Sequence, residues 1–380
     1  MRFKENRLSK KYGANRTSQP RFLQFCLFIL GVFSDPHLVQ SDGTTTITLE
    51  GIQYNATDDI SVKSKKLVIG PKKIKVFYVF KNHTDQDITS EVSFPLPPVG
   101  KRAEFGYDPK PDPLYDCYDT IDKATRLDSV GDRSQNQGIK DGINLKVAHQ
   151  DPHGKVRPIR TYLQVRAIDH NNKDITDQLR QLGIPISAAF VKDTMRLSEN
   201  GQGLGNHPEE YKALRAKLKK LNLLDSWWDN TATYVWQDTF PAKKDLHVYH
   251  SYNPLAGSSL DPSRRFAKGL HLIEGSGEPF IKDEHDEEGW KKFSYRFSDY
   301  SANVSYILST GGPWKNGVIK DFTLVIKRGD PKSFVATNFP GTFKKNKEGD
   351  YVCHIKNYRP QQEPLRVAYL YEFGVNVHRG

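Results

Sequence analysis

Apolar and polar residues alternate on either side of a polar break between Lys73 and Pro98. A period of two is typical of a β-strand. Residues 82–87 have the composition of a turn, and the alternation then resumes until prolines end it at 95, 97 and 98. We therefore expect an antiparallel hairpin with one wholly apolar face, which a second layer must cover. The apolar positions of the first strand are Ile74, Val76, Tyr78 and Phe80.

Similar patterns predict strands along most of the remaining chain. The segment 231–254 holds two strands, one with Trp236 on its apolar face and one with His250 and Tyr252 on a single side. The other expected strands are residues 45–49, 60–69, 103–107, 143–148, 159–168, 293–297, 302–309, 318–326, 351–355 and 365–373. About a dozen short strands predict a mainly β protein built from antiparallel β-sandwiches.

A small helical insertion interrupts this β pattern. Asp174 is a good N-cap for a helix over 175–182, and Gly183 is a good stop. Pro208 suits the first turn of a second helix, whose apolar stripe is expected to pack against a sheet. The predicted organisation is an N-terminal β domain (42–172) with a polar excursion (108–141), the helical insertion (173–226) and a C-terminal β domain (227–380) packed with the first.

The first 41 residues have the layout of a signal peptide. Seven basic residues precede the mostly apolar run 22–33, which is too short to span a bilayer comfortably but suits the apolar region of an export signal. Ser41 offers a small residue for cleavage, and retention of the segment as an N-terminal anchor is the alternative. We expect the rest of the protein in the periplasm or outside the cell, without a membrane span after removal of the signal.

The net charge of +11 is unevenly distributed along the chain. Residues 1–40 carry seven basic and two acidic side chains, a charge of +5, so the rest of the chain carries only +6. That is an ordinary surface balance, and we expect no nucleic-acid partner.

Five segments of this chain, in order, form a recognisable set. They are residues 58–98, 174–187, 234–254, 306–331 and 354–370, and they include the strings KIKVFYVFKNHTDQDITSEVSFPLPP and YVWQDTFPAKKDLHVYHSYNP. Together they resemble a bacterial exported family, the domain-of-unknown-function family 4424. The resemblance implies a periplasmic β-rich protein of the cell envelope, and it brings no activity, cofactor or catalytic residue. The excursion 108–141 is longer than the family pattern.

Three groups of residues resemble known ligand-binding motifs only weakly. Gly201, Gly203 and Gly205 lack the strand and the lysine of a phosphate-binding loop, which favours a connector. His247 and His250 lie three apart on a strand and so on opposite faces, which excludes a shared metal. The acidic run 283–288 lacks the spacing of a calcium loop, which favours a solvated loop, and we expect neither a metal nor a cofactor.

The sequence contains no familiar catalytic motif, neither Gly-x-Ser-x-Gly nor His-Glu-x-x-His. An enzyme is therefore the less favoured class, although a triad is assembled in space and need not show in sequence. A cleft that brings His250 or His354 together with carboxylates would favour an envelope hydrolase.

Aromatic residues offer the nearest approach to a ligand surface. The binding candidates are Trp236, Tyr249, Tyr252 and Trp314, although core packing is the favoured role for Trp236 and Trp314. Removal of the signal would take Cys26 with it, leaving Cys117 and Cys353 as a candidate disulfide in an oxidising compartment.

Three functions follow from these observations. The favoured one is a noncatalytic exported module that binds envelope glycan or a protein partner. The alternatives are an envelope hydrolase and a structural component that contributes strand edges to an envelope assembly. The sequence does not identify the ligand or the oligomeric state.

Overall fold

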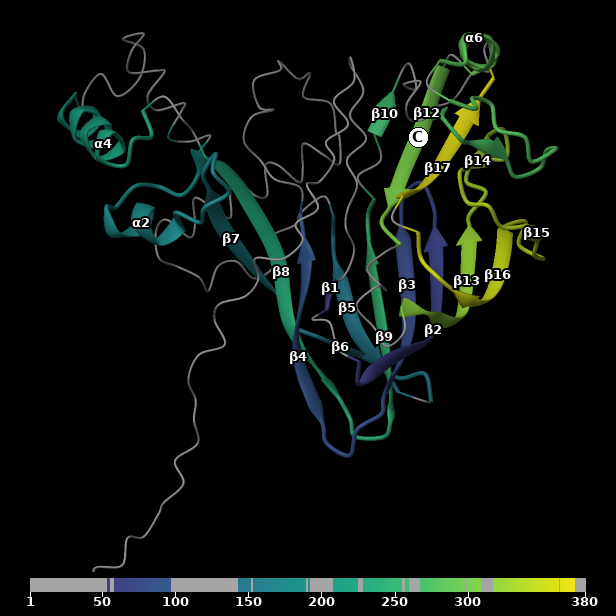
Figure 1. The fold of residues 1–380 in the computed structure, drawn as a ribbon, viewed down its shortest axis with the longest axis horizontal. Helices are drawn as coiled ribbons and strands as arrows, with labels where there is room; N and C mark the ends of the chain where they lie inside the picture. The colour runs from purple at the N-terminus through teal and green to yellow at the C-terminus, as the bar shows by residue number, and fades with distance from the viewer. Residues whose placement is uncertain are drawn as a thin grey trace, which may run out of the picture. The chain divides into compact units, whose positions relative to one another are not determined.

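The computed structural model describes residues 53–54, 58–96, 143–151, 153–188, 191, 208–224, 228–254, 257–259, 267–283, 285–297, 299–308, 317–361 and 363–372. This part of the chain is mainly β, as the alternating sequence predicts (Figure 1). The strands are β1 (Gln53–Tyr54), β2 (Ile60–Ile69), β3 (Ile74–Asn82), β4 (Ile88–Pro95), β5 (Lys146–Gln150), β6 (Val156–Pro158), β7 (Tyr162–Ile168), β8 (Asp229–Phe240), β9 (Asp245–Tyr252), β10 (Gly257–Ser259), β11 (His271–Leu272), β12 (Asp299–Tyr306), β13 (Ile319–Ile326), β14 (Phe334–Thr337), β15 (Lys344–Lys345), β16 (Tyr351–Tyr358) and β17 (Leu365–Tyr371). The helices are α2 (Thr176–Gln181), α4 (Pro208–Lys220) and α6 (Glu287–Arg296).

The described strands form three sheets. An eight-stranded sheet has the order β15-β16-β13-β2-β3-β9-β5-β6, a five-stranded sheet the order β10-β12-β17-β14-β11, and a four-stranded sheet the order β1-β4-β8-β7. Neighbouring strands in these sheets are antiparallel, except that β2 and β13 run parallel. The eight-stranded sheet therefore combines strands from both ends of the sequence. The domain boundaries expected from the sequence stay a prediction.

The predicted hairpin between residues 73 and 98 is wrong, although both of its strands exist. Strand β3 pairs with β2 and β9 in the eight-stranded sheet, whereas β4 pairs with β1 and β8 in the four-stranded sheet. The polar break carries the chain from one sheet to the other. Buried Asn82 fixes this corner, because its side-chain amide donates to Phe240 O at 2.9 Å and to Gln86 O at 2.8 Å.

The strand predicted at 293–297 is also wrong, because residues 293–296 belong to helix α6 and Phe297 is its C-cap. The carboxylate of Asp286 accepts a hydrogen bond from the Gly289 N–H at 2.8 Å and so caps the helix. Phe293 and Phe297, four residues apart, pack against Ala336 and Leu370 of the five-stranded sheet. Helical spacing of aromatic residues therefore defines this segment.

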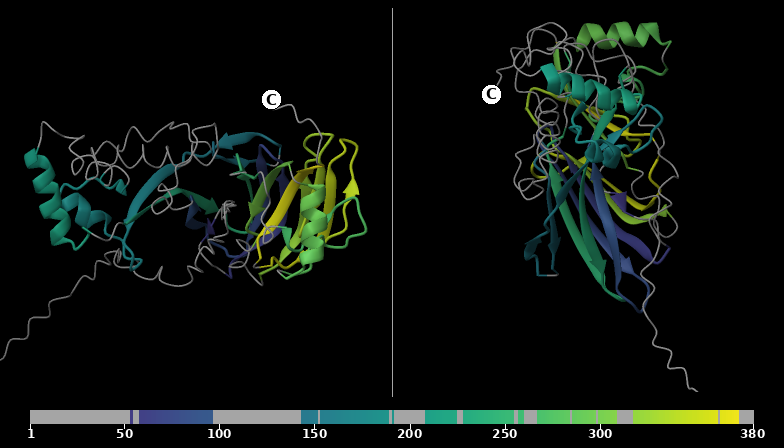
Figure 2. Two further views of the ribbon diagram at one scale, coloured as in Figure 1. Left: turned by 90° about the horizontal axis from the view of Figure 1, so that it is seen from above. Right: turned by 90° about the vertical axis from the view of Figure 1, so that its left-hand side faces the viewer.

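Side chains of both smaller sheets contact one face of the eight-stranded sheet, which we call its inner face. Figure 2 shows the sheets from two further sides. Phe80 of β3 and Phe240 of β8 meet edge to face, with ring centroids 5.5 Å apart. Tyr369 of β17 donates from its hydroxyl to Ile69 O of β2 at 3.4 Å. The other face of the five-stranded sheet is covered by α6. The antiparallel sandwich predicted from sequence is thus confirmed, with one large sheet shared by two smaller ones.

Candidate functional site

A β-bulge in β2 directs the side chain of a lysine toward the protein interior. The pairing of β2 with β3 shifts register between Val62 and Ser64, so the inward phase of the strand changes there. Val62 faces inward before the bulge, and Lys65 faces inward after it together with Leu67. Lys65 is only 1% exposed, whereas its neighbour Lys66 is exposed. Bulges are over-represented next to active sites because they re-aim a side chain.

Three aromatic rings continue from Lys65 along the inner face of the eight-stranded sheet. The Lys65 Nζ lies 5.1 Å from the ring centroid of Tyr78, its direct partner on β3. The rings of Tyr78 and His250 stack at 5.8 Å, and those of His250 and Tyr252 stack at 6.1 Å. The alternation of β3 and β9 places all three rings on this face.

The five-stranded sheet completes this group from the opposite side. Tyr306 of β12 holds its ring centroid 5.0 Å from the Lys65 Nζ, so the amine lies close to two aromatic rings. We call Lys65, Tyr78, His250, Tyr252 and Tyr306 the interior cluster. Every one of these side chains is buried.

Several polar atoms of the interior cluster make no hydrogen bond within the described part of the chain. They are the Lys65 Nζ, both ring nitrogens of His250 and the Tyr252 hydroxyl. Burial, with a smaller contribution from the charge of Lys65, lowers the pKa of His250 to about 3, so its imidazole is neutral at physiological pH. Burial, followed by the influence of Tyr78, raises the pKa of Tyr252 well above its usual value of 10 and keeps its hydroxyl a donor.

The four-stranded sheet brings one aromatic side chain against this group. Phe94 of β4 meets the Tyr252 ring edge to face at 4.9 Å. Trp236 lies on β8, beside the strand that holds Phe94, and its buried Nε1 has no hydrogen-bond partner among the described residues. Trp236 belongs to the same hydrophobic core as the interior cluster.

The structure separates the residues that the sequence singled out. Trp236 and Tyr252 both lie inside, in the core between the eight-stranded and four-stranded sheets. Tyr249 lies on the outer face of the eight-stranded sheet, where its ring is 4.9 Å from that of Phe77. Trp314 and Cys117 lie outside the described residues, so the disulfide with Cys353 stays a prediction. Cys353 itself is buried, and burial raises its thiol pKa.

Sequence reasoning placed His250 and Tyr252 correctly on one side of their strand, but it missed Lys65. The segment ISVKSKKLVI has apolar residues at Ile60 and Val62, then at Leu67 and Ile69. The inward positions thus change from even to odd residue numbers within one strand. Such a change requires one extra residue, a β-bulge, between the two pairs. That change was the available signal for an inward lysine.

The described histidines do not assemble a catalytic triad around the interior cluster. His149 pairs with the fully buried Asp238 at 2.8 Å, and His354 pairs with Asp321 at 3.2 Å. In the part of the chain that the structure describes, no carboxylate bonds to His250.

A serine–histidine pair lies elsewhere, where β2 begins and β3 ends. The Ser61 Oγ is 2.8 Å from the His83 Nε2, within reach for activation of an alcohol by a base. Ser61 is 5% exposed, so its hydroxyl is closed to a substrate carbonyl in this structure.

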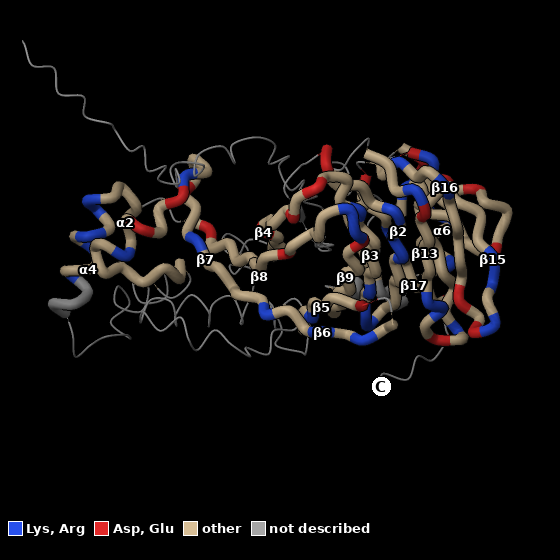
Figure 3. Tube along the Cα trace, turned by 90° about the horizontal axis from the view of Figure 1, so that it is seen from below, with Lys and Arg blue, Asp and Glu red and all other residues tan. Residues whose placement is uncertain are grey.

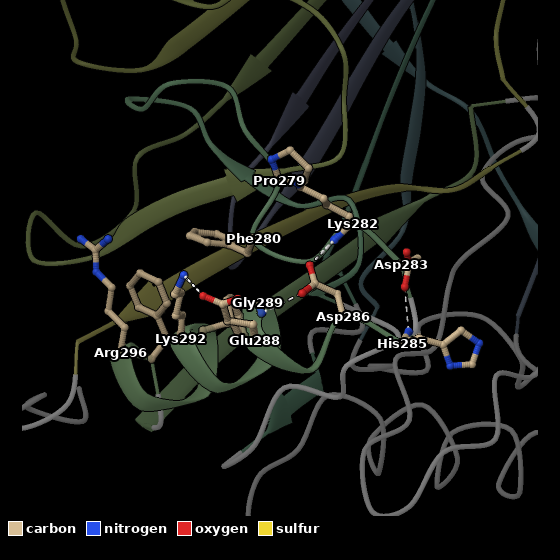
Figure 4. A pocket seen from close by; sticks show the side chains of 12 residues that line it. Pro279, Phe280, Lys282, Asp283, His285, Asp286, Glu288, Gly289, Lys292 and Arg296 are labelled. Atoms are coloured by element: carbon tan, nitrogen blue, oxygen red, sulfur yellow. Dashed lines mark hydrogen bonds and ion pairs between the residues drawn. The ribbon is translucent and has the colours of Figure 1, made fainter.

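A surface hollow of about 650 Å³ lies beside α6 (Figure 4). Its polar groups largely satisfy one another. Asp286 accepts from the backbone N–H groups of Lys282 and Gly289, and the Lys292 amine donates to Glu288. Asp283, in the acidic run considered for calcium, accepts from the His285 N–H. Because these polar groups are already paired, the hollow is a weaker candidate than the interior cluster.

The remaining surface offers no single-sign charged face among the described strands. Lys and Arg positions are interleaved with Asp and Glu positions (Figure 3), and Lys63 pairs with Asp245 at 2.6 Å on the outer face. Among the described residues, no three His, Cys, Asp or Glu side chains are grouped as metal ligands would be. None of the described helices combines the length and the apolar character that crossing a membrane requires.

Comparisons with known proteins give a family but no activity. The sequence model of a family described as "Domain of unknown function (DUF4424)" matches residues 41–115 and 152–367. No curated protein matches the chain. Among solved structures it is similar to a crystal structure from Legionella pneumophila subsp. pneumophila str. Philadelphia 1, described as a "putative nutrient binding protein". The two are 12% identical over 86% of this chain and 72% of that chain, with a TM-score of 0.38, which supports no inference about function.

Proposed function

The chain belongs to the family described as a domain of unknown function (DUF4424), and we propose that it is an exported, noncatalytic protein that binds a small molecule at the interior cluster. One observation carries the proposal. Lys65 is buried between two sheets, and its amine has neither a hydrogen-bond acceptor nor a carboxylate partner in the described part of the chain.

The energetic cost of this arrangement supports a functional role. A buried polar group without a hydrogen bond costs about 1–3 kcal/mol, and a charged group costs more. The cluster concentrates such groups from Lys65, His250 and Tyr252 within one stack of rings. A methionine or leucine at position 65 would fill the same space without that cost. Local rules are commonly broken at functional sites, where a ligand satisfies what the fold leaves unpaired.

Catalysis is not part of the proposal. The interior cluster offers hydrogen-bond donors and ring faces, but the described residues place no carboxylate on His250 to orient it as a base. Among the described residues, the Ser61–His83 contact favours the hydrolase alternative, and the burial of Ser61 counts against it.

Ligand retention tests the proposal directly. We expect wild-type protein purified from its own cell envelope to carry a small molecule in native mass spectrometry, and to lose that mass on denaturation. Lys65→Met should lose the ligand because the amine is its main polar contact. Lys66→Met changes an exposed lysine on the next residue and should retain it. Equal ligand content in all three proteins, or none in any, would contradict an interior site.

Export is the second element of the proposal, supported by the basic segment and the apolar run at 22–33. We expect the native protein to be found outside the cytoplasm, with residues 1–41 removed. Mass spectrometry of the native N-terminus, after separation of the cell fractions, measures both. A cytoplasmic protein that begins at Met1 would refute this element and leave the interior site untouched.

A further inference from the structure

The unpaired groups of the interior cluster consist mainly of donors. An ammonium offers three N–H donors and no acceptor, and an indole offers one donor and no acceptor. A neutral imidazole offers one donor and one acceptor, and a phenol can do both. Lys65, His250 and Tyr252 of the cluster, and Trp236 elsewhere in the same core, contribute buried atoms of this kind that have no hydrogen-bond partner among the described residues. The complementary ligand is therefore rich in acceptors.

The cluster can hold at most one cation, the Lys65 ammonium. His250 is neutral because burial disfavours its charged form. Asp245, the acidic residue at the start of β9, pairs with Lys63 and Lys81 instead. A ligand with one negative charge would neutralise Lys65, whereas a multiply charged ligand would bury excess charge at a high cost.

The surroundings of the cluster are apolar and aromatic. Val76 and Val248 lie on the same inner face, and Phe94 closes against Tyr252. Ring faces of this kind suit a flat apolar body, since aromatic pairs gain stability from stacked and edge-to-face contacts. A ligand that matches the site thus combines one anionic acceptor group with an apolar, preferably aromatic, body.

We propose that the interior site, if it is the ligand site assigned above, binds an apolar monocarboxylate whose carboxylate pairs with the Lys65 Nζ. The His250 imidazole, whose pKa is lowered by burial and further by the Lys65 charge, supplies a further hydrogen bond to the same carboxylate, and the Tyr252 ring lies one ring farther along the stack. The polar atoms of the cluster are closed to solvent in this structure, so the sheets separate locally when the ligand enters. Association is therefore slower than for an open site.

Calorimetric titration with three probes that share a phenyl ring tests the ligand class. The probes are benzoate, its neutral isostere benzamide, and phenyl phosphate. For the wild-type protein we expect benzoate to bind about 10–100-fold more tightly than benzamide, the ratio expected for one buried charge-assisted hydrogen bond. Phenyl phosphate should bind more weakly than benzoate at a pH where it is a dianion. Lys65→Met should remove the preference for benzoate over benzamide, whereas Lys66→Met should keep the preference of the wild type.

A more conservative substitution in the same cluster controls for effects of misfolding. Tyr252→Phe removes one hydroxyl and keeps the ring, and we expect it to keep the preference for benzoate over benzamide, because that hydroxyl lies one ring beyond His250. Equal affinity of the wild type for benzoate and benzamide, with both weakened by Lys65→Met, would overturn the carboxylate assignment and keep the interior site. A preference for phenyl phosphate would overturn it in the same way. Failure of all three probes to bind at millimolar concentration would overturn the ligand class, whereas ligand retention in native mass spectrometry decides the proposed function separately.

Discussion

Replacing Phe80 by Ala is expected to lower the free energy of unfolding by about 3–5 kcal/mol, the usual cost of deleting a buried phenylalanine. Phe80 is fully buried, stacks on Tyr78 with centroids 5.0 Å apart, and meets Phe240 across the two sheets. Its removal opens a cavity between the eight-stranded and four-stranded sheets. Urea unfolding followed by circular dichroism measures the change through the midpoint and slope of the transition.

Phe77 provides the matched control, because it lies on the same strand but on the outer face. It is half-buried and contacts the Tyr249 ring on that face. Phe77→Ala should cost about 1–2 kcal/mol, in keeping with the smaller apolar area that it buries. If the two variants lost equal stability, the assignment of inner and outer faces would be wrong.

In contrast to Phe80→Ala, Lys65→Met is expected to stabilise the protein and to raise its free energy of unfolding by about 1–4 kcal/mol. Buried ionic groups are often less favourable than apolar side chains of similar volume, since desolvation of the charge outweighs its interactions. Methionine fills the same unbranched space and can contact the Tyr78 and Tyr306 rings through its sulfur. The measurement is the midpoint of urea unfolding without added ligand.

Lys66→Met is the control for this prediction as well. Lys66 follows Lys65 in β2 and is exposed, so the change should alter stability by no more than about 0.5 kcal/mol. A Lys65→Met protein that is less stable than the wild type would show that the amine already has a partner in the ligand-free protein. The buried lysine would then be a structural element, and the reason to assign it a ligand would be lost.

Local alternation made most individual strands predictable. The expected strand 60–69 is β2 to the residue, and the two strands expected within 231–254 are β8 and β9. The pairing of strands could not be predicted in the same way. Two consecutive strands show the same alternating pattern whether they pair within one sheet or lie in two sheets that pack face to face. The corner at Asn82 illustrates this limit, since its buried side chain binds Phe240 O from a segment distant in sequence.

Helix α6 and the interior lysine were missed for different reasons. Asp286, followed by Glu287 and Glu288, has the composition of a helix N-terminus, but the short aromatic run after it also fits a strand. Lys65 was missed because an inward lysine contradicts the general rule that lysine is rarely buried. Only the phase change within β2 marked it.

The crystal structure of the wild-type protein grown in the presence of benzoate tests the interior binding site most directly. The account predicts electron density for one benzoate between the sheets, with a carboxylate oxygen about 2.7–3.2 Å from the Lys65 Nζ and its ring against the Tyr78–His250–Tyr252 stack. Benzoate bound only at the protein surface, with Lys65 still enclosed and unpaired between Tyr78 and Tyr306, would contradict it.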